Sequence, residues 1–436
     1  MLQYLRFQDV GPAPQMEITF KKRMNFLVGD NGLGKTFLLD AAWWALTRTW
    51  ARHPLAPKRQ VIRIHKGKRI ADPPPHPEIS YRYTKKTGGG THQHTSKFDR
   101  EGQIWPLPPG RPPMPGLVLY AQVDGGFSCW DPARNYWRGD NPDREAAYLF
   151  KPDEVWDGLP RDAPDKLCNG LITDWGYWQL ENGAPFQQMK KVLKALSPSE
   201  DEPLVPGRLV SKVSMEDSRK HPSIEMPYGQ TVPLIHASAG IRRVVALAYL
   251  LVWAWHEHLD ACELQEKEPA REIIFLIDEI EAHLHPQWQR RIVPALLDVM
   301  KALTGERRTP VQLIAATHSP LIMASAEPEF DEARDGVYHL DVREGSVRLD
   351  ELPWSKQGDV VNWLVSEYFG LRQGRSLDAE RAIEAAEAWM RGDRDALPVG
   401  LQSKREIHAE LERVLAGHDA FWPRWVVWTE RHGDAP

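Results

Sequence analysis

An apolar strand that runs into a glycine-rich loop and then into a helix constrains this chain more than any other feature. The strand reads MNFLV over residues 24–28, the loop reads GDNGLGKT over residues 29–36, and TFLLDAAWWALTRTW follows. The short apolar run is typical of a buried strand, and the apolar spacing after the loop is typical of a helix. This order predicts an α/β fold with the loop at the carboxyl end of a sheet.

The loop fits the spacing GxxxxGK[ST]. Its eight candidate nucleotide-binding residues are Gly29, Asp30, Asn31, Gly32, Leu33, Gly34, Lys35 and Thr36. Glycines let successive backbone N–H groups turn toward phosphate oxygens, and the helix N-terminus adds the positive end of its dipole. We expect Lys35 to reach the β- and γ-phosphates and Thr36 to place its hydroxyl on Mg²⁺. A chance glycine-rich turn is the alternative, but the flanking strand and helix disfavour it.

A second apolar strand ends in two acidic residues. Asp278 and Glu279 follow the run IIFLI at residues 273–277. Because ligands of open α/β sheets bind at the carboxyl ends of the strands, we expect Asp278 in the metal shell. We expect Glu279 to act as the general base that takes a proton from the attacking water. The alternative is a pair of solvated acids at the end of a strand.

Three further positions are candidate site residues because of their order along the chain. His318 follows the strand VQLIAA and is a candidate to face a γ-phosphate, although such a histidine is more often an ordinary loop residue. Gln122 ends the strand GLVLYA and is a candidate ligand of Mg²⁺ or of its water. Ser238, Ala239 and Gly240 begin a long helix. The serine suits an N-cap, and such a helix start can also grip a phosphate held mainly by another subunit.

Composition excludes several classes of protein. The chain has 436 residues, a net charge of −5 and 42% hydrophobic residues, which is ordinary globular usage. Cys129, Cys168 and Cys262 are scattered, which argues against a disulfide framework and suits a reducing compartment. We find no signal-peptide pattern, and the apolar run at residues 247–255 is too short to span a bilayer. We therefore expect a cytoplasmic protein without membrane contact.

Strands and helices alternate along most of the chain, which predicts a mixed or parallel sheet flanked by helices. Residues 51–115 differ: they contain 13 Lys and Arg against four Asp and Glu, a net charge of +9 that leaves −14 elsewhere. We expect this segment to be a basic antiparallel β-lobe that either binds nucleic-acid phosphate or is solvated. The expected divisions are a core of residues 1–50 and 116–345, a compact, partly helical insertion at 131–230, and a helical C-terminal region at 352–436.

Taken in order, these motifs resemble the ABC-type P-loop ATPases of the RecF/SMC branch. In that family a P-loop (Walker A), a Q-loop glutamine, a signature turn, a Walker B acid pair and a switch histidine form two composite ATP sites in a head-to-tail dimer. The resemblance implies that ATP and Mg²⁺ are the cofactors and that this chain hydrolyses ATP. It assigns catalysis to Lys35, Glu279 and His318, nucleotide contacts to the loop and to Ser238 and Gly240, and metal contacts to Thr36, Gln122 and Asp278.

Two details make the chain more similar to one group of these proteins, the ATPases of anti-phage defence. The segment EAHLHP at residues 281–286 is similar to that of overcoming-lysogenization and related defence ATPases. The interval between Gln122 and Ser238 leaves no room for a long coiled-coil arm, as in Septu-type and retron-linked ATPases, which work with a separate nuclease. One departure is Ala239, where the family signature usually has glycine.

The resemblance implies a subunit whose ATP-dependent dimerisation controls a partner effector, a nuclease, in anti-phage defence. The implied partners are a second copy or a higher even homo-oligomer, a separate nuclease, and DNA bound through residues 51–115. The alternatives are a RecF-like repair ATPase that acts on DNA directly and the ATPase subunit of a transporter.

No nuclease motif stands out in this chain. We expect Asp393, Arg394 and Asp395 to form a solvated turn, and the sequence THQHT at residues 91–95 lacks the acidic or cysteine partners of a metal site. Four tryptophans mark the C-terminal region as a docking surface or as packing onto the ATPase core: Trp389, Trp422, Trp425 and Trp428.

Overall fold

The computed structural model describes residues 1–58, 62–65, 68–71, 76–84, 90–110, 112–138, 143–161, 165–211, 213–305 and 309–432. Contacts divide the chain into two units, Met1–Trp363 and Leu364–Pro436. This division falls later than the expected start of the helical C-terminal region at residue 352. No helix among the described residues has the length and apolar character needed to cross a membrane.

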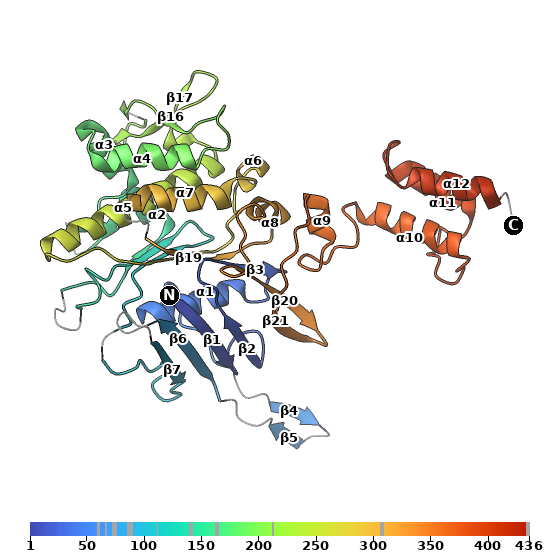
Figure 1. Ribbon diagram of the computed structural model, residues 1–436, viewed down its shortest axis with the longest axis horizontal. Coiled ribbons are helices and arrows are strands. Elements are labelled where there is room, and N and C mark those ends of the chain that lie inside the picture. The colour runs from blue at the N-terminus through green and yellow to red at the C-terminus, as the bar shows by residue number, and fades with distance from the viewer. Residues whose placement is uncertain are drawn as a thin grey trace. The chain divides into compact units, whose positions relative to one another are not determined.

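An eight-stranded mixed sheet forms the centre of the first unit (Figure 1). Its order is β10-β9-β8-β18-β19-β3-β20-β21. The five parallel strands are β8 (Leu117–Ala121), β18 (Ile273–Ile277), β19 (Val311–Ala316), β3 (Met24–Gly29) and β20 (Gly336–Arg343). The antiparallel strands are β10 (Tyr148–Phe150), β9 (Phe127–Trp130) and β21 (Ser346–Leu352). Every residue of β8 and β18 is buried, as expected for strands covered on both faces.

Helices cover both faces of this sheet. Figure 1 shows α1 (Lys35–Thr47) on one side, and α5 (Ala239–Leu264) and α7 (Ile292–Thr304) on the other. Trp43 and Trp44 of α1 are completely buried in the main hydrophobic core. This architecture confirms the α/β prediction and brings the ends of β3, β8, β18 and β19 to one edge.

A four-stranded antiparallel sheet lies beside α1. It consists of β2 (Gln15–Thr19), β1 (Leu2–Gln8), β6 (Glu78–Thr84) and β7 (Thr91–Lys97). The β-lobe expected at residues 51–115 therefore shares its sheet with the first 20 residues. A separate hairpin pairs β4 (Ile62–His65) with β5 (Lys68–Ala71).

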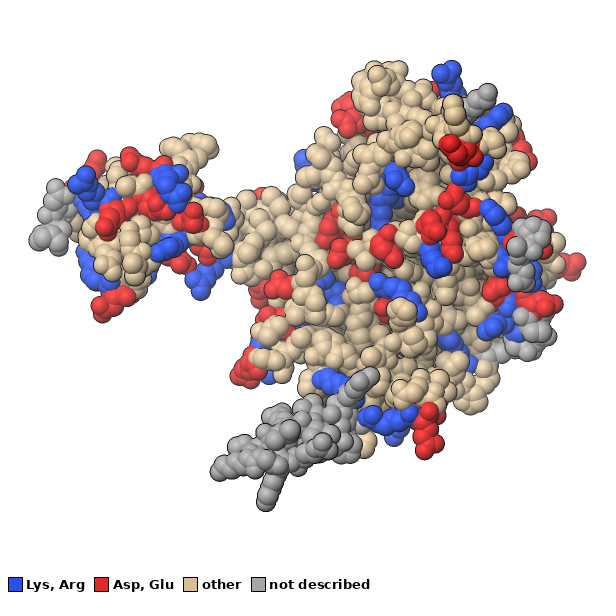
Figure 2. All heavy atoms as spheres, turned by 180° about the vertical axis from the view of Figure 1, so that it is seen from behind, with Lys and Arg blue, Asp and Glu red and all other residues tan. Residues whose placement is uncertain are grey.

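The proposed basic patch of this lobe stays a prediction. The structure does not describe the side chains of eight of its basic residues: Arg59, Arg63, Lys66, Lys68, Arg69, Lys85, Lys86 and Arg111. On the face shown in Figure 2, the basic and acidic side chains of the described residues are interspersed. Among the described residues, that face shows no extended region of one charge.

Residues 131–233 combine short helices with small ladders of strands. The helices are α2 (Pro152–Asp157), α3 (Leu171–Glu181) and α4 (Ala184–Ala195), and the strands are β11 (Leu159–Pro160), β12 (Lys166–Cys168), β13 (Val205–Pro206), β14 (Val210–Ser211), β15 (Lys220–His221), β16 (Ser223–Glu225) and β17 (Thr231–Pro233). Helix α4 packs on both α5 and α7.

The segment from Pro286 to Thr304 forms two helices rather than one. The structure has α6 (Pro286–Gln289), a break, and then α7. Pro294 explains the break, because a proline inside a continuous helix would clash with the preceding turn, whereas it is tolerated in the first turn of α7.

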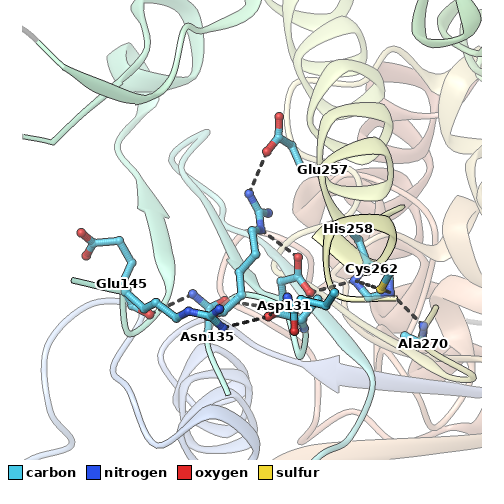
Figure 3. A network of polar contacts seen from close by, with 11 residues as sticks. Asp131, Asn135, Glu145, Glu257, His258, Cys262 and Ala270 are labelled. Carbon is cyan, nitrogen blue, oxygen red and sulfur yellow. Dashed lines mark hydrogen bonds and ion pairs between the residues drawn. The ribbon is translucent and has the colours of Figure 1, made fainter. Parts of the chain in front are cut away.

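A buried polar network fixes α5 against the sheet (Figure 3). His258 of α5 lies with its Nδ1 2.7 Å from Oδ1 of Asp131, which follows β9. The backbone N–H of Ala270 donates to Nε2 of the same ring at 2.8 Å. Because Nε2 accepts, the ring proton of a neutral His258 lies on Nδ1 and is donated to Asp131.

Cys262 adds a sulfur 3.6 Å from Nε2 of His258. Cysteine, histidine and aspartate can form a nucleophilic site, but here all three side chains are buried and Nε2 already accepts a backbone hydrogen bond. The network therefore braces α5 and does not form an accessible reactive site.

The second unit has its own core. It contains α10 (Leu377–Arg391), α11 (Lys404–Val414) and α12 (Trp422–His432), preceded by α9 (Val360–Val365) at the junction. Trp389 and Trp425 are core residues of this unit, and Trp422 and Trp428 pack against them. These tryptophans therefore pack within their own unit, and a docking role for this region stays a prediction. The residues of the 393–395 turn are exposed, as expected.

Candidate nucleotide-binding site

The glycine-rich loop connects β3 to α1. Gly29 has a φ of 132°, and a Cβ there would lie 2.2 Å from the Leu340 carbonyl oxygen, so only glycine fits. Lys35 folds back over the loop, where its Nζ donates to the carbonyls of Gly29 (2.7 Å) and Asp30 (2.8 Å). The ammonium group thus lies inside the curve of backbone that the sequence predicts to hold phosphate.

Thr36 and Asp278 meet although 242 residues separate them. The Thr36 Oγ1 lies 2.8 Å and 3.0 Å from the two carboxylate oxygens of Asp278, which is buried. Hydroxyl and carboxylate oxygens are ligands that Mg²⁺ prefers, so this pair fits the expected metal. The described residues contain no group of three or more His, Cys, Asp and Glu arranged for a metal. Few protein ligands are typical of Mg²⁺ sites completed by substrate phosphates and water.

Arg52 belongs to this site and not to the basic lobe with which the sequence groups it. Its guanidinium lies 3.1 Å from Asp40, 3.4 Å from Asp278 and 2.7 Å from the Tyr120 hydroxyl. Burial raises the pKa of Asp278, while Thr36 and Arg52 lower it. One feature of the sequence points to this network. Asp40 lies four residues after Thr36, so the two side chains share one face of α1.

Glu279 and His318 approach each other beside Lys35. Glu279 is half-exposed with a φ of 46°, and its Oε1 lies 3.9 Å from Nε2 of His318. Burial lowers the pKa of His318 and the Lys35 charge lowers it further, while Glu279 opposes both. A neutral imidazole at pH 7 can donate a hydrogen bond to a phosphate oxygen, and an accessible carboxylate can take a proton from water.

Gln122 lies directly beside the acid pair. The backbone N–H of Asp278 donates to the Ala121 carbonyl at 2.9 Å, because β8 and β18 are adjacent parallel strands. The Gln122 side chain is buried and donates to the Ser128 hydroxyl at 2.9 Å. Its role at the metal therefore stays a prediction.

The Ser238 turn caps α5, with the Ser238 hydroxyl accepting from the Ile241 N–H at 3.3 Å. Gly240 packs closely on the segment after the acid pair, since a Cβ there would lie 2.8 Å from the His283 carbonyl oxygen. Among the described residues, no hydrogen bond joins Ser238 to the loop at residues 29–36. Beside this helix, residues including Phe127, Trp156 and Arg243 line a cavity of about 470 Å³.

Comparison with known proteins agrees with the geometry. Residues 134–324 match the family model "AAA domain, putative AbiEii toxin, Type IV TA system". The chain is 35% identical over 98 residues to the Septu protein PtuA of Bacillus mycoides (strain KBAB4), which is 22% of this chain and 12% of that protein. It is 44% identical over 57 residues to the Retron Vc95 probable ATPase of Vibrio cholerae serotype O1 biovar El Tor, which is 13% of this chain and 9% of that protein.

The chain is therefore similar to an AAA-domain family over residues 134–324 and, over shorter stretches, to a Septu protein and a retron ATPase. The matched stretches cover only about a tenth of the length of these two relatives. Among solved structures, an SMC head bound to the C-terminal winged-helix domain of ScpA aligns with 81% of this chain and 97% of that chain, at 16% identity and a TM-score of 0.42. At that score, the fold assignment depends on the sheet order and the site geometry.

Proposed function

We propose that this chain binds ATP with Mg²⁺ and hydrolyses it to ADP and phosphate. The observation that carries the proposal is the convergence of residues from three separate segments at one edge of the sheet: Lys35, Thr36, Asp278, Glu279 and His318. Their chemistry matches phosphoryl transfer, which needs positioning and charge stabilisation more than covalent steps.

Each side chain has a specific task in this proposal. The loop backbone and Lys35 hold the β- and γ-phosphates, and Thr36 and Asp278 hold Mg²⁺. When bound, Mg²⁺ neutralises charge on the phosphate oxygens. Glu279 accepts a proton from the attacking water, and neutral His318 donates a hydrogen bond to the γ-phosphate.

Phosphate release by the purified chain tests this proposal. Glu279→Gln should lower kcat by roughly 100-fold or more while ATP binding persists, because the amide cannot accept the proton. The exposed Glu332→Gln is the matched control. Wild-type turnover in Glu279→Gln would contradict the assignment of the general base.

We further propose that two copies form composite sites, with Ser238 of one copy gripping the nucleotide held by the other. The family resemblance supports this arrangement, as does the lack of a hydrogen bond between Ser238 and the P-loop within one described chain. Glu279→Gln with saturating ATP should then have the mass of a dimer in solution, and Ser238→Arg added to it should return the monomer mass. A monomer in both cases would contradict the composite site.

The dimer's role is proposed to be control of a separate nuclease in anti-phage defence. The similar stretches in a Septu protein and a retron ATPase support this role. Co-expression with neighbouring gene products, followed by phage challenge, tests it. Protection that survives Lys35→Ala would contradict control by ATP. Purification of the chain together with recombination proteins, and with no nuclease, would favour the RecF-like alternative.

A further inference from the structure

The carboxylate of Glu281 bridges the loop that carries His318. Glu281 lies three residues after Asp278, in the turn that follows β18. Its Oε2 accepts a hydrogen bond from the Thr317 hydroxyl at 2.8 Å, and its Oε1 accepts one from the His318 backbone N–H at 2.5 Å. Both oxygens are thus committed to two consecutive residues more than 35 positions away in the sequence.

Glu281 provides a hydrogen-bond acceptor at a position where the neighbouring strand provides none. The backbone N–H of Thr317 donates to the Leu27 carbonyl at 3.0 Å, which is the last bond between the ends of β19 and β3. His318 is the first residue beyond that ladder, and its N–H needs another acceptor when shielded from water. Glu281 supplies the acceptor, and the backbone of His318 is fixed as a result.

A second contact from the same segment holds the neighbouring residue. Gln289, at the end of α6, accepts from the Ser319 hydroxyl at 2.6 Å and donates to the Leu284 carbonyl at 2.9 Å. The segment after the acid pair therefore holds three consecutive loop residues, 317–319. Of these two contacts, that of Glu281 is the one that reaches His318.

The backbone around Glu281 has an unusual conformation. Glu279 has a φ of 46° and His283 a φ of 62°, so two non-glycine residues in the left-handed region flank it. A non-glycine residue in this region is strained, and the conformation persists only when surrounding contacts determine it. The close packing of the His283 carbonyl against Gly240 is one of those contacts.

We propose that Glu281 is a positioning residue that sets the imidazole of His318 against Glu279 and the γ-phosphate. The inference rests on the proposed ATP hydrolysis and names a residue that none of the expected catalytic or binding sets contains. Glu281 acts through the backbone of His318, since both of its carboxylate oxygens accept from residues 317 and 318. Its loss should therefore slow hydrolysis without weakening ATP binding.

Glu281→Gln tests this directly, since an amide retains the size of the side chain but can accept through only one of its two terminal atoms. We expect kcat to fall roughly tenfold or more, because small displacements of a catalytic group are costly, with KM and Kd for ATP within about twofold of wild type. Glu263→Gln, an exposed substitution on α5, is the matched control and should leave kcat unchanged.

A second pair of variants keeps the test valid if Glu281→Gln does not fold. Thr317→Ser retains the hydroxyl donor and should keep near wild-type kcat, whereas Thr317→Val removes it and should lower kcat. Unchanged kcat in both Glu281→Gln and Thr317→Val, with an active wild type, overturns the positioning role alone. A wild type that binds ATP but releases no phosphate overturns the proposed hydrolysis itself.

Discussion

The hydroxyl of Thr36 lies within 3.0 Å of both carboxylate oxygens of Asp278. Thr36 lies in the first turn of α1, the helix that follows β3. Asp278 directly follows β18, and β19 lies between β18 and β3 in the sheet. Their contact places the expected metal ligands together.

Thr36→Val should weaken the response to Mg²⁺. The substitution keeps the shape of the side chain and removes its oxygen, so the Mg²⁺ concentration for half-maximal turnover should rise roughly tenfold or more. The exposed Thr231→Val is the control, and turnover measured against Mg²⁺ at fixed ATP is the readout. An identical Mg²⁺ curve for Thr36→Val would refute the metal assignment.

ATP affinity should depend on pH through Lys35. Burial lowers the pKa of Lys35 to about 8, although Glu279, Glu281 and Asp278 oppose the shift. Phosphate favours the ammonium form, so binding above pH 8 must take up a proton, and affinity should fall by up to about tenfold per pH unit. Below pH 8 the lysine is already charged and this dependence vanishes.

Titrations of ATP binding between pH 7 and 9.5 measure this effect. Lys35→Arg provides the comparison, because a guanidinium stays protonated throughout this range. A flat wild-type profile above pH 8 would show that Lys35 does not contact the phosphates.

Arg52→Met should destabilise the fold and impair the site. The substitution leaves the Asp40 and Asp278 carboxylates without their shared cation. Because Arg52 is partly exposed, we expect a loss of about 1–2 kcal/mol in the free energy of unfolding. Urea denaturation measures the loss, with the exposed Arg208→Met as control. Equal stability of the two variants would contradict a structural role for this network.

His258→Ala should destabilise the chain more strongly. It removes the buried partner of Asp131 and leaves the Ala270 N–H without its acceptor, at a cost of about 3 kcal/mol. His53→Ala, at an exposed position, should change the free energy of unfolding by less than about 0.5 kcal/mol. Similar urea midpoints for the two variants would show that the network does not brace α5.

The sequence predicted the local parts of this site well. The loop, the acid pair and His318 each follow a strand whose apolar run is readable without tertiary information. Since parallel strands end at one edge, their convergence followed from the fold class. The composite action of Ser238 and the metal role of Gln122 stay predictions.

The sequence did not predict the contacts between distant segments. Arg52 counted as one more basic residue of the β-lobe, and Glu281 as part of a motif without an assigned contact. Their partners, Asp278 and the His318 loop, lie 226 and 37 residues away.

The amino-acid sequence by itself determined which residues can carry phosphate chemistry, because glycine conformations, apolar runs and strand-end acids are local properties. Only the tertiary structure decided which side chains hold them in place. That choice depends on strand order and on the path of the chain between strands, and neither is encoded in local periodicity.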